Sequence, residues 1–197
     1  MRQLALMMAG LGLVAVLATG CQKARQPKTY AVVNTTRGDI VILLDTAEAP
    51  ETVSVFVGFV RGQREYLDRK SKTGGYVQKP LYNGTSFYRV EPDRQVEGGD
   101  PNGEGDVGPG VRFADEISPR LRHDKPGVVG MVPYGQGSYG SQFYITLTPM
   151  PEFDGQRTIF GQVERGIEVV RVISQTPATD GKPGEPVKVN YVKLIEK

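Results

Sequence analysis

Runs of β-prone, largely apolar residues alternate with turn-forming segments through most of the chain. Residues 30–34 and 40–44 are two such runs, and the polar, glycine-containing stretch between them predicts a β-hairpin. Further strand candidates follow at short intervals, at residues 85–90, 127–132, 142–147, 158–163 and 187–195. Short strands separated by turn signals predict a mainly β fold.

Two segments have helical spacing instead. Pro50 suits the first turn of a helix and Glu51 suits its positive end. Apolar residues follow at helical spacing up to Gly62, and residues 166–174 predict a second, shorter helix. The polar stretch 63–79 predicts a long surface loop. Many strands with two helices indicate a closed or nearly closed barrel capped by helices, although this pattern does not distinguish a barrel from a sandwich.

Composition agrees with a turn-rich β fold of one domain. The 197 residues include 25 glycines and 14 prolines, and there is no tryptophan. The formal net charge is only +2, so the chain has no electrostatic footprint for nucleic acid, and we expect no nucleic-acid partner. We expect a monomer.

The first twenty residues have a different character. Arg2 precedes an uncharged, mostly apolar run at residues 4–18, which is short for a bilayer-spanning helix but suits the core of a secretory signal. The run ends in small residues before Cys21, and this sequence resembles the lipobox of bacterial lipoproteins. The resemblance implies cleavage before Cys21 and acylation of its sulfur. An incidental thiol in an ordinary signal peptide or signal anchor is the alternative.

The chain therefore divides into three predicted segments. Residues 1–20 are a lipoprotein signal peptide, 21–29 are the lipidated cysteine and a tether, and 30–197 are the folded domain. Cys21 is the single cysteine, so an internal disulfide is impossible. These features predict an exported protein that is lipid-anchored to a bacterial membrane, on the periplasmic side or at the cell surface.

Six motifs follow one another in the folded domain. They lie at residues 82–90, 97–101, 123–127, 140–146, 153–155 and 160–161, and they include the segments YNGTSFYRV, EGGDP and GSQFYIT. In order and spacing they resemble the cyclophilin-type peptidyl-prolyl isomerases over about residues 30–197. The resemblance implies a closed eight-stranded antiparallel barrel with two capping α-helices. It also implies a groove for proline-containing polypeptides, and rotation about the X–Pro bond without a cofactor.

The resemblance implies catalytic roles for Arg89 and Gln142. In the twisted transition state the proline nitrogen regains its lone pair, and a fixed donor aimed at that nitrogen stabilises it. Arginine stays charged and carries several donors, while a glutamine amide can both donate to and accept from the substrate backbone. Strand alternation places Gln142 and Tyr144 on one face and Phe143, Ile145 and Leu147 on the other. The alternatives are an arginine in a surface salt bridge and a polar outer face without function.

The resemblance assigns further residues to the substrate groove, and several differ from the family pattern. The expected groove residues are Tyr88, Arg94, Gln95, Glu97, Met131, Val132, Pro133, Tyr144, Phe153 and Arg157. Arg94 and Gln95 replace an apolar phenylalanine and methionine that wall the proline pocket, and Glu97 replaces a glutamine. Tyr88, Pro133, Tyr144 and Arg157 also replace the usual histidine, asparagine, phenylalanine and histidine. Glu97 is expected to pair with either Arg94 or Arg89.

Polar pocket walls bury less apolar area against a proline ring, so these replacements predict weakened or altered isomerase activity. A catalytically weak proline-peptide-binding module on the same fold is therefore the alternative function. A small-molecule-binding barrel fits only the number of strands. His123 is the single histidine and lies in a turn motif without a nucleophile, so we interpret it as structural. With one histidine and one acylated cysteine, we expect no metal site.

Overall fold

The structure is a computed structural model that describes residues 27–72, 74–106, 108–135 and 139–197. The predicted signal peptide, Cys21 and most of the predicted tether lie outside the described residues. Within the described part of the chain, no helix is both long enough and apolar enough to cross a membrane.

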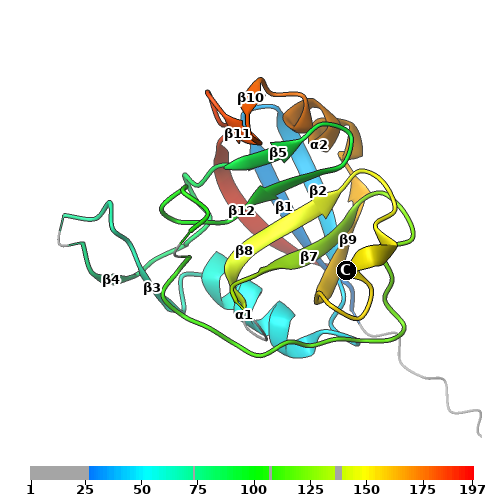
Figure 1. The fold of residues 1–197 in the computed structure, drawn as a ribbon. Coiled ribbons are helices and arrows are strands. Elements are labelled where there is room, and N and C mark those ends of the chain that lie inside the picture. Colours follow the sequence, from blue (N-terminus) through cyan, green and yellow to red (C-terminus); the bar gives the residue numbers. More distant parts are fainter. Residues whose placement is uncertain (1–26, 73, 107, 136–138) are drawn as a thin grey trace, which may run out of the picture.

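Eight antiparallel strands form one strongly curled sheet (Figure 1). In sheet order they are β12 (Val189–Glu196), β1 (Thr29–Thr35), β2 (Gly38–Leu44), β9 (Ile159–Arg165), β7 (Val128–Pro133), β8 (Tyr139–Thr146), β6 (Gln95–Gly98) and β5 (Arg89–Glu91). The predicted hairpin at residues 30–44 is the β1–β2 pair. The mainly β prediction is confirmed.

The curl brings the two ends of the sheet close together. The segments just before β5 and β12 exchange backbone hydrogen bonds, with Phe87 N–H donating to Val187 O at 3.0 Å and Val189 N–H donating to Thr85 O at 2.8 Å. In the described residues β5 and β12 are nevertheless the two edges of the ladder and do not pair with each other. The sheet is thus a curled half-barrel, and its complete closure stays a prediction.

Two α-helices lie at opposite ends of the curled sheet, as predicted (Figure 1). The first, α1 (Pro50–Val60), begins at its proline and buries Phe56 and Phe59. It ends before Gly62, whose backbone has φ of +67° and lies so close to residues 79–80 that a Cβ atom would collide with them. The second, α2 (Ile167–Ser174), buries Val170 and Ile173.

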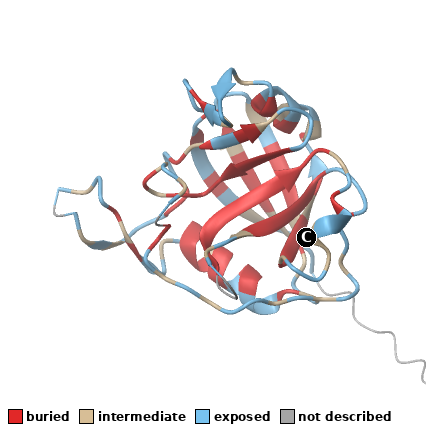
Figure 2. Ribbon diagram, in the orientation of Figure 1, coloured by how far each residue is buried: buried red, intermediate tan, exposed pale blue. Residues whose placement is uncertain are grey.

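Aromatic side chains fill the interior of the sheet. Phe56 of α1 packs against Tyr82 and Phe160 at ring distances of 4.9 and 5.3 Å. Figure 2 shows the buried residues concentrated in the strands and on the inner face of α1. Phe143 and Ile145 on β8, and Leu147 directly after it, join this core whereas Gln142 and Tyr144 do not, which confirms the predicted alternation. Residues that would line the lumen of a ligand-binding barrel are therefore core residues, which argues against that alternative.

The connections differ from prediction in three places. The expected surface loop 63–79 contains a small hairpin, β3 (Glu65–Leu67) with β4 (Tyr76–Gln78), and a second one joins β10 (Ala178–Thr179) to β11 (Lys182–Pro183). A short 3-10 helix, η1, covers Pro151–Phe153. Strand β6 was not predicted, because its sequence has few apolar residues, yet all four of its residues are buried.

Candidate active site

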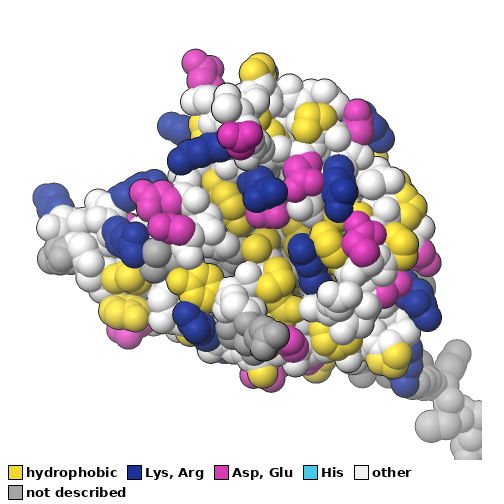
Figure 3. Space-filling model, viewed as in Figure 1, with side chains coloured by type: hydrophobic (Ala, Val, Ile, Leu, Met, Phe, Trp, Pro, Cys, Tyr) yellow, Lys and Arg dark blue, Asp and Glu magenta, His cyan; other side chains and the backbone are white. Residues whose placement is uncertain are grey.

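Three neighbouring strands place Arg89, Glu97 and Tyr144 next to one another. In the register of β5, β6 and β8, Arg89 lies opposite Glu97, and Glu97 lies opposite Tyr144. Residues opposite one another on antiparallel strands project from the same face, so these side chains form a row across the sheet. Figure 3 shows positive and negative side chains interspersed on the molecular face over these strands.

Arg89 is held at the rim of this row by two glutamates. Its Nε and Nη2 atoms donate to Glu91 Oε1 at 3.3 and 3.2 Å, and its Nε lies 3.9 Å from Glu97 Oε1. The Arg89 side chain is still 51% exposed, so part of the guanidinium can reach a substrate. Glu91 was not among the predicted site residues, although its position two residues after Arg89 on a strand places it on the same face.

Arg94 is engaged elsewhere. Its Nε lies 3.2 Å from Glu91 Oε2, and its Nη2 donates to Glu152 Oε1 at 3.0 Å. Of the two partners considered for Glu97, the structure therefore selects Arg89. Gln95 is buried, and its Nε2 donates to both Glu91 and Glu97 at 3.1 Å. The two positions that replace apolar walls thus form a polar, hydrogen-bonded rim.

Tyr88 connects the β5–β6 side of the site to Gln142. Its hydroxyl lies 3.1 Å from Gln142 Oε1 and 3.4 Å from Glu97 Oε2. Burial, reinforced by the charge of Glu97, raises the pKa of Tyr88, so its hydroxyl keeps its proton at neutral pH. Gln142 is itself buried, at 4% exposure. Arg89 and Gln142 are therefore linked through Glu97 and Tyr88.

The floor of the groove is aromatic and carries a cation. The rings of Tyr144 and Phe153 lie 5.7 Å apart. The Arg157 guanidinium lies 3.4 Å above the centre of the Phe153 ring and 5.4 Å from that of Tyr144. This is a cation–π arrangement, and it covers a ring face on which an apolar group could otherwise pack.

His123 supports this floor from beneath. Its Nδ1 lies 2.9 Å from Asp154 Oδ1, and its Nε2 lies 2.6 Å from the Tyr144 hydroxyl. Burial lowers the pKa of His123, so the ring is neutral, donating to Asp154 through Nδ1 and accepting from Tyr144 at Nε2. Gly130 lies opposite Tyr144 on the neighbouring strand β7, and a Cβ atom at this position would collide with the Tyr144 hydroxyl. The contacts agree with the structural interpretation of this histidine.

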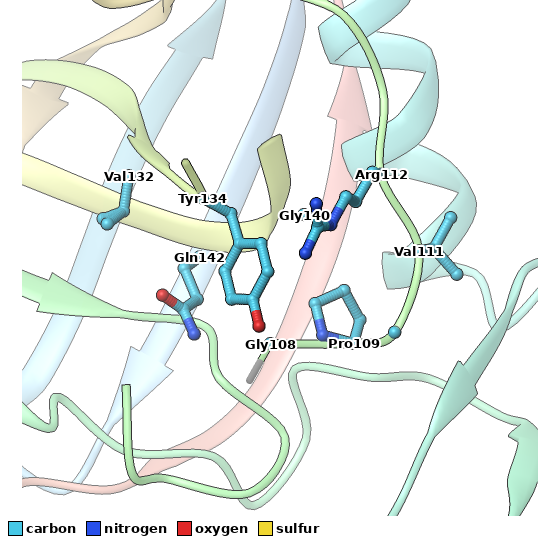
Figure 4. Close-up of a pocket in the computed structure, with 9 residues that line it drawn as sticks. Gly108, Pro109, Val111, Arg112, Val132, Tyr134, Gly140 and Gln142 are labelled. Atoms are coloured by element: carbon cyan, nitrogen blue, oxygen red, sulfur yellow. The ribbon is translucent and has the colours of Figure 1, made fainter. Parts of the chain in front are cut away.

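The three predicted groove residues on β7 lie in different environments. Met131 is 1% exposed and belongs to the core, whereas Pro133 is exposed. Val132 lines a cavity of about 200 Å³ beside Gln142 (Figure 4). The other lining residues are Gly108, Pro109, Gly110, Val111, Arg112, Tyr134 and Gly140. The Arg112 guanidinium stacks on the Tyr134 ring at 4.4 Å from its centre. This contact was not predicted from the sequence, because the two residues are far apart in the chain.

A second, smaller cavity of about 170 Å³ adjoins Arg89. It is lined by Tyr88, Arg89, Glu97, Glu104, Gly105, Asp180, Gly181 and Lys182. Within the described ranges, no three His, Cys, Asp or Glu side chains are grouped so that they could hold a metal ion.

Comparison with known proteins identifies the family. The family model described as cyclophilin type peptidyl-prolyl cis-trans isomerase/CLD matches residues 30–194, nearly the whole described chain. The chain belongs to the cyclophilin family. Peptidyl-prolyl cis-trans isomerase A of Mycobacterium tuberculosis is 41% identical over 168 residues, covering 83% of this chain and 91% of the relative. Peptidyl-prolyl cis-trans isomerase B of Streptomyces anulatus is 42% identical over 168 residues, covering 84% and 94%. Peptidyl-prolyl cis-trans isomerisation is accordingly the enzymatic function of this cyclophilin.

Solved structures support the fold. A cyclophilin-type isomerase from Cryptosporidium parvum superposes with a TM-score of 0.71 at 24% identity, covering 85% of this chain and 98% of that one. The same protein in the presence of the dipeptide Ala-Pro gives a TM-score of 0.68 at 24% identity, covering 83% and 96%.

Proposed function

We propose that this cyclophilin isomerises X–Pro bonds in exported polypeptides, assisting their folding, with Arg89 and Gln142 as its catalytic residues. Uncatalysed rotation about an X–Pro bond takes tens to hundreds of seconds, because amide resonance must be broken. A catalyst must therefore stabilise the twisted amide more than either planar form. The crystal structure of the C. parvum isomerase in the presence of Ala-Pro supports proline-containing peptides as the substrate class.

Arg89 supplies the stabilising donor. As the amide twists, the proline nitrogen regains lone-pair density and becomes a hydrogen-bond acceptor. The exposed part of the guanidinium donates to that nitrogen, while Glu91 and Glu97 hold the rest of the group in place. Gln142 binds the substrate backbone on one side of the bond, so that the other side can rotate. No covalent intermediate forms.

The observation that carries this proposal is the placement of Arg89. An arginine in an ordinary surface salt bridge is mobile and contributes little. Arg89 instead faces two carboxylates, one of them 9% exposed, and is linked through Tyr88 to a buried glutamine. Such preorganisation is what electrostatic catalysis requires, because no reorganisation is needed at the moment of reaction.

Exchange spectroscopy by NMR on a panel of X-Pro peptides tests the proposal, using residues 22–197 and the Arg89→Ala variant. We expect acceleration of cis–trans exchange by the wild type and a loss of about 10²–10³-fold in kcat in the variant, as for removal of one preorganised donor. Arg61→Ala, which removes an exposed arginine paired with Glu196, is the matched control and should keep full activity. Undiminished activity in Arg89→Ala would refute the catalytic role.

A catalytically weak binding module is the second candidate, and the groove floor favours it. Arg157 covers the Phe153 ring, and Arg94 and Gln95 give the rim a polar character. A proline ring would have to displace the Arg157 guanidinium or pack on its apolar stem. A folded wild-type sample that binds proline peptides but accelerates none of them would support this candidate over the first.

We further propose that the enzyme works at a membrane surface. The apolar run at residues 4–18 and the small residues before Cys21 support export and acylation. Each buried CH₂ of an acyl chain contributes about 0.8 kcal/mol, so several chains hold a domain at a bilayer. The proposal predicts a mature chain that begins with acylated Cys21, followed by a short polar tether and the isomerase domain.

A further inference from the structure

Glu97 is a buried carboxylate whose two oxygens face different partners. Oε1 accepts a hydrogen bond from Gln95 Nε2 at 3.1 Å and lies 3.9 Å from Arg89 Nε. Oε2 lies 3.4 Å from the Tyr88 hydroxyl. A buried carboxylate is costly unless it is paired and hydrogen-bonded. Gln95, Arg89 and Tyr88 therefore offset the cost of burying the Glu97 carboxylate.

The Tyr88 hydroxyl has one proton but faces two acceptor oxygens. These are Glu97 Oε2 and Gln142 Oε1. At the same time Gln142 Nε2 is buried without a hydrogen-bond partner among the described residues. Both features are resolved if the Gln142 amide is reversed, because the two ends of an amide have nearly the same shape. Gln142 Nε2 then donates to the Tyr88 oxygen, and Tyr88 gives its proton to Glu97.

We propose that Glu97 is a positioning residue of this isomerase, holding the Arg89 guanidinium and setting the direction of a hydrogen-bond chain from Gln142 through Tyr88 to Glu97. In this direction Gln142 presents its carbonyl oxygen to the cavity beside Gly108, where a backbone N–H of the substrate can donate to it. The inference rests on the proposed roles of Arg89 and Gln142. It adds that the negative charge of Glu97 sets both the position of the Arg89 guanidinium and the orientation of the Gln142 amide.

Gln95 supports an ionised Glu97. Its Nε2 has two protons, and the two acceptors within reach are Glu91 Oε1 and Glu97 Oε1. An amide that donates to two carboxylates matches two negative charges. When Glu97 is neutral, its attraction for Arg89 disappears and Tyr88 is free to donate to Gln142 instead. The chain of hydrogen bonds then runs in the opposite direction.

Charged or titratable side chains face Glu97 from each element packed against it. They are Tyr88, directly before β5, Arg89 and Glu91 on β5, Tyr144 on β8, Arg157 before β9, and Glu104, Asp180 and Lys182 in the adjoining cavity. Burial, together with Glu91, raises the pKa of Glu97 against the opposing effect of Arg89 and Arg157. Glu97 thus takes up its proton at a less acidic pH than an ordinary glutamate does.

The kinetic experiment compares wild type with Glu97→Gln by peptide exchange spectroscopy over a range of acid to neutral pH. Wild-type kcat should fall on the acid side as Glu97 is protonated. Glutamine is the usual family residue here, but in this chain a neutral residue 97 leaves the Tyr88 hydroxyl free to donate to Gln142. Glu97→Gln should therefore lack that fall and have kcat lowered by about ten- to a hundredfold with a smaller change in KM, as for a slight misplacement of a catalytic group. Tyr88→Phe removes the hydroxyl that links Gln142 to Glu97 but keeps the Arg89–Glu97 pair. This variant should therefore retain the acid-side fall in kcat and have a raised KM.

Glu164→Gln is the matched control, because Glu164 is an exposed glutamate on β9 of the same sheet. Stability distinguishes positioning from a structural role. Because Glu97 binds its proton more tightly in the folded state, its contribution to stability is present below the ordinary glutamate pKa. That contribution is lost as pH rises through the raised pKa. Glu97→Gln should therefore be at least as stable as wild type at neutral pH while being slower.

A direct readout is the nuclear Overhauser effect from the Gln142 side-chain amide protons. In wild type at neutral pH they should contact the Tyr88 ring, and in Glu97→Gln they should contact the Gly108 α protons. Amide protons that face Gly108 in wild type, or Glu97→Gln with wild-type kcat and pH profile, would overturn the inference. If wild type accelerated no peptide, the proposed function would fail instead, while the amide orientation would still report on the hydrogen-bond chain.

Discussion

Among single residues, His123 shows how a buried polar side chain of the groove is satisfied by its neighbours. Its Nδ1 faces Asp154 and its Nε2 accepts from Tyr144. Burial opposes ionisation of Asp154, but hydrogen bonds from His123 and Arg122 outweigh it and lower the pKa of Asp154. The phenolic oxygen that distinguishes Tyr144 from the usual phenylalanine therefore has a structural partner.

Tyr144→Phe tests that partnership. Without the hydroxyl, the buried His123 Nε2 loses its donor, and leaving a buried acceptor unsatisfied costs about 1–3 kcal/mol. We expect the free energy of unfolding in urea to fall by this amount at neutral pH, with isomerase activity kept because the ring remains. Tyr191→Phe, which removes an exposed hydroxyl, is the control and should be neutral. Equal stabilities of the two variants would show that the Tyr144 hydroxyl contributes nothing.

Among the elements, the long segment between β6 and β7 supplies the N-terminal cap that α1 lacks in its own sequence. Ala49 at the N-cap supplies no side-chain hydrogen bond to the helix. Glu116 does so from a distance in sequence, with Oε1 accepting the Glu51 N–H at 3.1 Å and Oε2 accepting the Thr52 N–H at 2.8 Å. A carboxylate at this end also interacts favourably with the helix dipole.

Glu116→Ala should therefore destabilise the domain by about 1 kcal/mol, the usual cost of losing an N-cap. The matched control is Asp115→Ala, because this neighbouring carboxylate is exposed and forms no hydrogen bond with α1 among the described residues. Urea unfolding measures both variants. If Asp115→Ala lost as much stability as Glu116→Ala, general charge rather than capping would account for the effect.

In the molecule as a whole, the two ends of the described domain are joined by backbone hydrogen bonds. The Lys28 N–H donates to Lys197 O at 2.7 Å, and the Lys197 N–H donates to Lys28 O at 3.0 Å. The predicted tether therefore joins the domain at Lys197, beyond the end of β12, whereas the segment before β5 of the proposed active site contacts the opposite end of β12, at Val187 and Val189. A membrane anchor attached there is compatible with a substrate groove that stays accessible.

Cys21→Ser in the full-length chain tests the anchor. Wild type should partition with bacterial membranes, and mass spectrometry of its mature N-terminus should give an acylated Cys21. The variant should move to the soluble fraction with unchanged isomerase activity, since Cys21 lies outside the domain. An unmodified, uncleaved Cys21 in the native protein would contradict lipidation.

Six motifs in a characteristic order indicate the family, and the amino-acid sequence alone predicts the mainly β fold, the β1–β2 hairpin, both helices and the alternation along β8. The structural features depend on local patterns, because a helix or strand needs only the right spacing of apolar residues and turn signals within its own length. Three features become visible only in the folded protein: β6 is a buried strand, Glu97 pairs with Arg89 rather than Arg94, and Glu116 caps α1. Each of these depends on contacts between strands or segments far apart in the chain, where burial and competing partners fix a side chain's role.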